Sequence, residues 1–147
     1  MAPRSLEQRK ADTLELLRTT EDAWIATAGS AGAHLVPLGF WWDGEILTMT
    51  TPTETPTARN ADATGRARVA VGPTRDVVMI AGSVEVTSPA DTPASVRRGF
   101  AEATGWDPEW NPGEWVYLRI RPERVQAWRE ADEIEGRTIM RAGRWLS

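Results

Sequence analysis

Short apolar segments, several with alternating apolar and polar positions, follow one another along most of the chain and are separated by turns rich in glycine and proline. Segments of this length and composition are typical of β-strands. The Asp43-Gly44 pair between two of them predicts a tight hairpin. Strands are expected at residues 23–28, 34–43, 45–51, 66–72, 76–88, 114–123 and 124–130, and the segment 136–147 predicts a final strand or a turn.

Three other segments have the periodicity and the end signals of helices. In the first, Leu6, Leu14 and Leu17 can share one face. The second and third begin at Thr55 and Thr92, each a threonine N-cap followed by a proline, and each ends at a glycine. The expected helices are residues 4–19, 55–65 and 92–105.

The strands and helices together predict one closed architecture. Antiparallel strands in this number favour closure into a barrel, because closure removes exposed sheet edges. No internal repeat or domain boundary is visible, and 147 residues are an ordinary length for one domain. We therefore expect a mainly β (α+β) fold, an antiparallel six- to seven-stranded barrel with two or three helices, as a single domain over residues 1–147.

Composition excludes several classes of function. The net charge of −4 offers no positive field for nucleic acid or for an anionic membrane. No apolar run approaches the roughly 20 residues of a membrane span, and the N-terminus lacks the apolar core of a signal peptide. The lack of cysteine excludes disulfides and thiol nucleophiles, and we expect a cytoplasmic protein. With His34 as the single histidine, neither a Ser-His-Asp triad nor a metal site is expected. The acidic residues within 132–135 are expected to form a solvated face.

Residues 50–60 concentrate hydroxyl groups and turn residues between two expected strands. The free N–H groups and partial positive charge of a helix N-terminus suit a phosphate, and Arg59 follows one turn into the expected helix. Arginine can also bind phosphate through two parallel hydrogen bonds. Two interpretations stay open at this point: a capped surface helix with a solvated arginine, or a site for an anionic ligand.

Eight tryptophans are many for a chain of this length. Trp41 and Trp42 are adjacent in an expected strand and therefore point to opposite faces, one inward and the other outward or toward a partner. Trp106, Trp110 and Trp115 gather near the start of a late strand. Packing and stacking on a ligand are both open for these rings.

Several of these motifs together resemble a known family. The order of "VPLGFWWDGEILTMTT", "TARNADATGRARVAV" and "AGSVEV", followed by "RIRPERVQAWRE", is similar to the pyridoxamine 5′-phosphate oxidase-like split β-barrel flavoproteins over roughly residues 6–130. Within that superfamily the chain most resembles the deazaflavin (coenzyme F-420)-dependent oxidoreductases of the B type. The resemblance implies a split barrel that uses F-420 or FMN for hydride transfer to a small organic substrate.

The resemblance also implies where the cofactor binds. The phosphate is expected at the end of the third strand and the start of the following helix, and the ring along the second and third strands. The family often has lysine where Arg59 stands. The phosphate residues implied are Thr50, Thr51, Thr57, Arg59 and Asn60, and the ring residues are Val36, Pro37, Leu38 and Gly39.

A homodimer is expected on two grounds. The strands at 34–42, 76–87 and 114–121 carry apolar residues on both faces, and one side of "FWW" cannot hide every large ring. The resemblance implies a cofactor groove between subunits, with Trp128 or its neighbours supplied by the partner chain.

The rival hypothesis is a module without catalytic activity that binds a flavin, a deazaflavin or a haem-type ligand. No acid–base pair or nucleophile stands out, so no catalytic residue is predicted, and in cofactor enzymes the cofactor carries the chemistry. Pyridoxamine phosphate oxidase activity itself is not expected, because the arginine pattern for the substrate phosphate is missing near the C-terminus. F-420 is favoured over FMN on resemblance alone.

Overall fold

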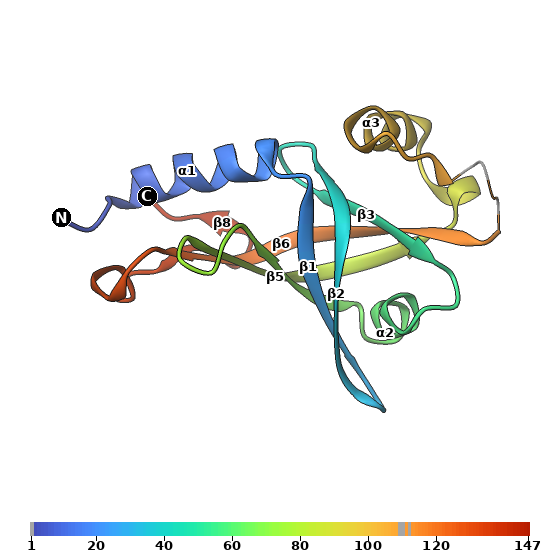
Figure 1. Ribbon diagram of the computed structural model, residues 1–147, viewed down its shortest axis with the longest axis horizontal. Coiled ribbons are helices and arrows are strands. Elements are labelled where there is room, and N and C mark those ends of the chain that lie inside the picture. The colour runs from blue at the N-terminus through green and yellow to red at the C-terminus, as the bar shows by residue number, and fades with distance from the viewer. Residues whose placement is uncertain (1, 109–110, 112) are drawn as a thin grey trace.

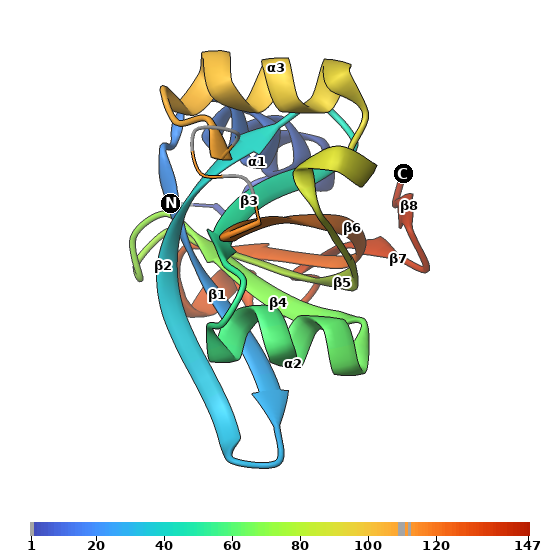
Figure 2. The same ribbon diagram turned by 90° about the vertical axis from the view of Figure 1, so that its right-hand side faces the viewer.

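A computed structural model describes residues 2–108, 111 and 113–147 of the chain. Six antiparallel strands close into a barrel in the order β3-β2-β1-β4-β5-β6, with β3 pairing to β6 (Figures 1 and 2). Two further strands, β7 and β8, extend the sheet beyond β6. The strands are β1 Asp22–Gly29, β2 Gly32–Trp42, β3 Leu47–Pro52, β4 Arg66–Val71, β5 Val77–Thr87, β6 Trp115–Trp128, β7 Thr138–Arg141 and β8 Arg144–Trp145. The predicted mainly β barrel is confirmed.

The turn between β2 and β3 forms where the Asp-Gly pair predicted it. The Asp43 carboxylate accepts hydrogen bonds from the backbone N–H groups of Glu45 and Ile46, at 2.8 and 2.7 Å. Gly44 takes a φ of 99°, a conformation that favours glycine. The segment 136–147 contains both alternatives that the sequence left open, since β7 and β8 are strands joined by a short turn.

One prediction about the strands is wrong: residues 114–123 and 124–130 form a single strand, β6. Pro122 and the charged pair after it suggest a break, but the strand continues through an irregularity. Gly82 pairs with Pro122 and Ala81 with Arg124, so Glu123 is the extra residue of a bulge. A side chain on Gly82 would collide with the backbone of Arg121, so this close approach needs glycine.

Three α-helices pack against the barrel: α1 Leu6–Thr19, α2 Pro56–Thr64 and α3 Ala94–Thr104. The predicted cap of α2 is confirmed, because the Thr55 hydroxyl accepts a hydrogen bond from the N–H of Ala58 at 3.2 Å. The predicted cap of α3 is wrong. The Thr92 hydroxyl instead donates to the carbonyl of Ser88 at 2.7 Å, and Pro93 takes the N-cap position. A short 3₁₀ turn, Pro89–Asp91, precedes Thr92, and the backbone N–H of Thr92 donates to the carbonyl of Pro89 before α3 begins.

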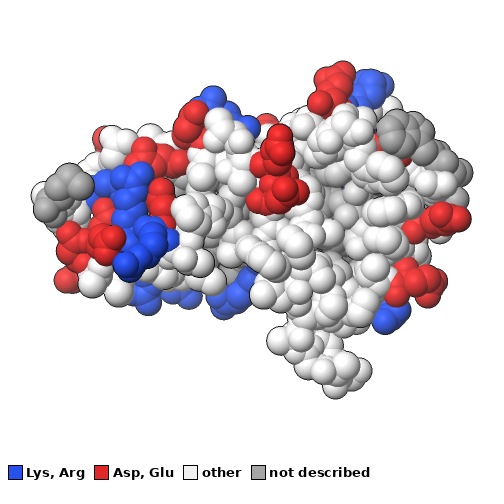
Figure 3. Space-filling model, viewed as in Figure 1, with Lys and Arg blue, Asp and Glu red and all other residues white. Residues whose placement is uncertain are grey.

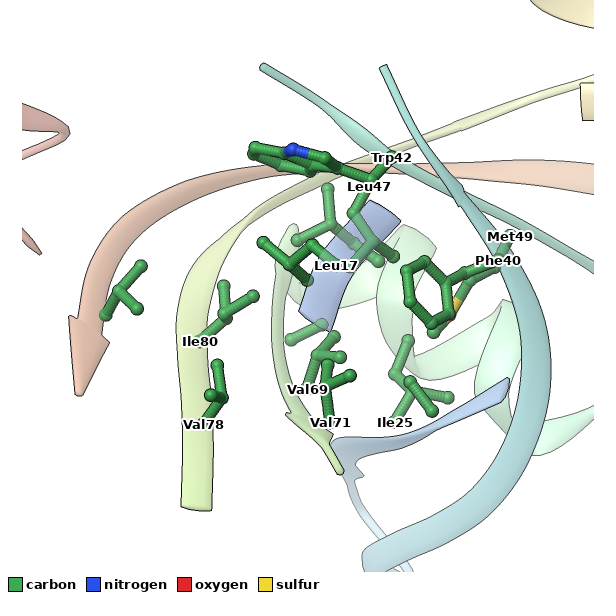
Figure 4. Close-up of a cluster of buried hydrophobic side chains, with 14 of the residues drawn as sticks. Leu17, Ile25, Phe40, Trp42, Leu47, Met49, Val69, Val71, Val78 and Ile80 are labelled. Atoms are coloured by element: carbon green, nitrogen blue, oxygen red, sulfur yellow. The ribbon is translucent and has the colours of Figure 1, made fainter. Parts of the chain in front are cut away.

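The barrel interior is a continuous apolar core (Figure 4). Ile25 from β1, Phe40 from β2 and Val69 from β4 point into it. Leu17 from α1 and Ala61 from α2 belong to the same buried cluster, so both helices contribute to the core. Among the helices that the structure describes, none is both long and apolar enough to cross a membrane.

Trp41 and Trp42 do point to opposite faces: Trp42 is buried and Trp41 is half-buried. Trp42 lies in the core with Phe40. The Trp41 ring packs on the backbone of α3 at Gly99, where any added Cβ would collide with the ring. One side of the strand thus hides Phe40 and Trp42 but not Trp41, and the expectation that a partner covers the remaining apolar surface stays a prediction.

The expected solvated face at 132–135 is wrong for Glu133, which is only 3% exposed, whereas Asp132 and Glu135 are exposed. The Glu133 carboxylate accepts hydrogen bonds from the backbone N–H and the guanidinium of Arg4, both at 2.7 Å, and from the backbone N–H of Arg129 at 2.9 Å. These donors, Arg4 first, lower the pKa of Glu133 to about 2. The N-terminal segment is thereby fixed to the segment after β6.

Candidate functional site

A cleft of about 560 Å³ lies between α3 and the outer side of β2 and β3. Three of the predicted ring residues, Pro37, Leu38 and Gly39, line it together with Thr50 of the predicted phosphate set. The volume is in the range typical of small-molecule sites. The remaining lining residues are Asp22, Phe100, Thr104, Trp106 and Trp115.

Aromatic contacts build one side of this cleft. The Trp106 and Trp115 rings meet edge to face with centroids 5.0 Å apart. Phe100 meets Tyr117 in the same way, at 5.8 Å and an interplanar angle of 85°. Trp106 and Trp115 therefore both pack on each other and border the cleft, while Trp110 lies outside the described residues.

Tyr117 is a buried phenol behind this wall, and the sequence did not single it out. It pairs with Thr50 across β3 and β6. Burial raises its pKa, the charge of Asp107 raises it further and that of Arg97 lowers it. Its hydroxyl has no hydrogen-bond partner among the described residues. The alternating pattern predicts that Tyr117 lies in a strand, but it does not predict which residues of other elements surround the phenol.

Most of the predicted phosphate residues lie around the start of α2. The Thr51 and Thr55 hydroxyls are 3.1 Å apart, and Thr57 is buried. Arg59 is exposed, and its guanidinium donates to the carbonyl oxygen of Glu54, just before the helix. A capped helix N-terminus and an exposed arginine are thus combined at one point, which is compatible with either interpretation of the sequence.

Asn60 ties α2 to β1. Its amide nitrogen donates to the Thr27 hydroxyl at 3.3 Å. Its side chain also lies directly over Gly29, where a Cβ would collide with the amide oxygen. These contacts hold the helix against the first strand.

Two predicted residues lie apart from the rest. Val36 packs against the barrel core. Trp128 is the last residue of β6, whereas Trp115 at the cleft is the first, so the length of the strand separates them. Trp128 has the Arg137 guanidinium over its ring at 5.8 Å.

A second cleft, of about 620 Å³, adjoins the first between the end of α1 and α3. The two share Asp22, Gly39 and Thr104. Asp22 was not singled out in the sequence, because its role at a junction depends on residues from β2 and α3. Within the described residues, no three His, Cys, Asp or Glu side chains gather in a metal-binding arrangement.

The sequence and the fold were compared with known proteins. Residues 10–129 match the family model for pyridoxamine 5′-phosphate oxidase. The chain belongs to this family. The family resemblance read from the motifs is therefore confirmed. No curated protein matches the sequence.

Several solved structures share the fold of this chain, although their sequence identity to it is low. A haem binding protein from Mycobacterium smegmatis has a TM-score of 0.72 at 18% identity, over 97% of this chain and 60% of that one. An F420 reductase has a TM-score of 0.62 at 20% identity, over 76% of this chain and 93% of that one. An FAD-binding protein from Mesorhizobium loti has a TM-score of 0.61 at 17% identity, over 79% and 89%. Identities this low show the fold alone.

Proposed function

We propose that this chain is an oxidoreductase that binds coenzyme F-420 or FMN, with F-420 favoured, and uses it on a small organic substrate. The observation that carries the proposal is the convergence of Pro37, Leu38, Gly39 and Thr50, from two strands, in one cleft of ligand size. Membership of the pyridoxamine 5′-phosphate oxidase family supports it. The F420 reductase and the FAD-binding protein among the similar folds support this cofactor class.

The cleft fits a flat ring. Gly39 has no side chain, and the Asp22 carboxylate oxygen is 3.6 Å from the position that a Cβ would take there. The backbone of β2 can therefore approach a ring closely. Trp106 and Trp115 line the same cleft in contact with each other and would shield part of the ring from water. When bound, the cofactor would supply the hydride chemistry, and these residues would orient its ring.

The phosphate of either cofactor is assigned to the start of α2. Pro56 has no N–H, and the N–H of Ala58 is bonded to the Thr55 hydroxyl. The support at this end is therefore the partial positive charge of the helix dipole and the full charge of the exposed Arg59 beside it. The hydroxyls of Thr51 and Thr57 and the amide of Asn60 belong to the same proposed set, although Asn60 would have to exchange its contact with Thr27. Both cofactors present a phosphate, so this end does not distinguish them.

The test is a binding titration of the purified protein with F-420 and with FMN, in wild type and Arg59→Ala. Arg59→Ala should weaken cofactor binding by about 1.5–3 kcal/mol, the range for hydrogen bonds to charged groups. Folding should not change, because Arg59 is exposed. The control is Arg75→Ala, another exposed arginine, which should bind as wild type does. A wild-type protein that binds neither F-420 nor FMN would refute the proposal. An affinity that is unchanged in Arg59→Ala would refute the phosphate assignment.

We further propose that the protein is a homodimer. The support is an apolar face on the outer side of β1 and β2, where Trp24 is 49% and Leu35 59% exposed. Figure 3 shows that this side of the molecule is largely uncharged. Trp24 pairs with Pro37 of the cleft, so a second copy on this face would adjoin the cofactor ring and could supply its Trp128.

Sedimentation velocity at micromolar concentration tests the dimer. The expected mass is about twice the 16.2 kDa of the chain, and Leu35→Glu should shift it toward the monomer. A wild-type mass near 16.2 kDa in the presence of cofactor would refute both the dimer and a site shared between subunits.

A module that binds a cofactor or haem without turnover is the second candidate. The haem binding protein from Mycobacterium smegmatis favours it, although this chain spans only 60% of that protein. Turnover decides between the two: consumption of reduced cofactor with a panel of quinones, enones and tetrapyrroles supports the oxidoreductase. Tight binding of haem or cofactor without any consumption supports the binding module.

A further inference from the structure

Asp22 lies where two clefts meet. The first cleft is the proposed ring site beside Trp106 and Trp115, and the second lies between the end of α1 and α3. The two clefts adjoin, because they share Asp22, Gly39 and Thr104, and we call the two adjoining clefts the channel. A molecule lying next to a ring in the first cleft would therefore have the Asp22 carboxylate beside it.

The channel has an unbalanced charge. Of the described residues, Asp22 is the only charged one that lines the first cleft. The second adds Glu21 and Arg18, but the Arg18 guanidinium is paired with Glu15. Neither Glu21 nor Asp22 has an ion-pair partner in the described part of the chain. Figure 3 shows acidic side chains near the start of β1, with uncharged surface extending from them across β1 and β2.

Aromatic rings line the same channel. The half-buried Trp106 and Trp115 border the first cleft and the half-buried Trp41 borders the second, whereas Phe100 and Phe40, which also line the clefts, are only 2% and 4% exposed. The face of an aromatic ring attracts a cation, most strongly where little water intervenes. An unpaired carboxylate and several aromatic rings therefore act in the same direction: both favour a ligand with positive charge and an apolar, flat body.

We propose that this channel selects a planar organic cation, so that the substrate carries a protonated amine or a fixed positive charge held by Asp22. As a statement about substrate, the inference rests on the proposed function. It agrees with the phosphate assignment, because an anionic group is repelled from Asp22 and is better placed near Arg59 at α2. The preference for cations itself requires no cofactor and is measurable without one.

Three ligands that share one ring system test the preference at pH 7.5. They are N-methylquinolinium, which is cationic, quinoline, which is neutral, and quinoline-2-carboxylate, which is anionic. Ligand-observed NMR titrations with the whole chain should give affinities in that order, with the cation at least fivefold tighter than quinoline. A cation that binds no more tightly than quinoline, or no binding of any of the three, would overturn the inference.

Asp22→Asn keeps the shape of the side chain and removes its charge. It should weaken N-methylquinolinium binding about fivefold, as expected for a partly solvated carboxylate, and change quinoline binding less than twofold. Asp62→Asn is the matched control, because Asp62 is exposed on α2 and lines neither cleft. An unchanged preference in Asp22→Asn would refute the role of Asp22.

The outcomes for substrate class and for proposed function are separable. A cation preference in a protein that binds neither F-420 nor FMN leaves the charge selectivity standing and refutes the oxidoreductase. Cofactor turnover in a protein without that preference refutes this inference alone.

Discussion

Helices α1 and α3 are attached to the same barrel by different forces. The region of α1 is fixed by buried charges in addition to Leu17 in the apolar core: Glu133 binds Arg4, and the guanidinium of Arg9 donates to the carbonyls of Glu133 and Gly136 at 3.1 and 2.9 Å. The region of α3 is fixed by ring contacts, with Trp41 on Gly99 and Phe100 on Tyr117.

The two regions also differ in how well their polar groups are satisfied. Glu133 accepts hydrogen bonds from three different N–H-bearing groups. Among buried side-chain atoms without a partner in the described chain, one is on α1, the Thr13 hydroxyl, and three are on β3 and β6 in the region of α3: the hydroxyls of Thr48 and Tyr117 and Nε of Arg119. Unmade hydrogen bonds are costly, so we expect the α3 region to be held less tightly. Both clefts border α3, which places the proposed ligand site in the less constrained region.

The largest expected effect is that of Glu133→Gln. The change removes the nearer of the two carboxylates paired with the buried Arg4 guanidinium and leaves only Asp12, at 3.1 Å, and breaking a buried ion pair costs about 3–5 kcal/mol. Urea denaturation should show a loss of unfolding free energy near the lower end of that range. Hydrogen exchange should accelerate in α1 more than in α3.

Glu135→Gln is the matched control, because Glu135 is exposed two positions away, and its stability should change by less than about 0.5 kcal/mol. Equal effects of the two substitutions would contradict the account of α1.

The same carboxylate predicts a dependence of stability on pH. The pKa of Glu133 is lowered from 4.5 to about 2 in the folded protein, chiefly by Arg4. A lowered folded pKa contributes stability above the unfolded value, and that contribution is lost as the pH falls from about 4.5 toward 2. At about 1.4 kcal/mol per pKa unit, the loss approaches about 3 kcal/mol.

Urea titrations between pH 6 and pH 2.5 measure this loss. The difference in unfolding free energy between wild type and Glu133→Gln should shrink as the pH falls, because the wild type loses the ion pair that the variant lacks. A difference that stays constant over this range would show that the charge of Glu133 is not what stabilises α1.

The comparison also shows where sequence reasoning succeeded. The turn at Asp43-Gly44 and the cap at Thr55 were predicted because each depends on hydrogen bonds between residues three or fewer positions apart. The barrel followed from the alternation of apolar positions in its strands. Pro37, Leu38 and Gly39 line one cleft together because they are neighbours in the sequence, and their role in binding a ring stays a prediction.

The failures involve partners that are distant in the sequence. The buried state of Glu133 depends on Arg4, which is 129 residues away. The continuity of β6 through Pro122 depends on Gly82 in another strand. Asp22 has its role only because Gly39 and α3 lie beside it. Local propensities contain none of these relations.

The smallest expected effect is that of Gly99→Ala in α3. A Cβ at this position would collide with the Trp41 ring, and overpacking costs typically about 1–3 kcal/mol. Alanine is also the better helix former by about 1 kcal/mol, which offsets part of that cost. We therefore expect a net loss of about 1 kcal/mol in urea denaturation.

Trp41→Leu provides the background that isolates the collision. With the ring removed, the Gly99→Ala change should become neutral or stabilising by up to about 1 kcal/mol, because only the helix propensity remains. This reversal of sign would attribute the attachment of α3 to packing of a ring on helix backbone. A loss of the same size in both backgrounds would mean that Gly99 is needed for another reason and that α3 is held by contacts other than Trp41.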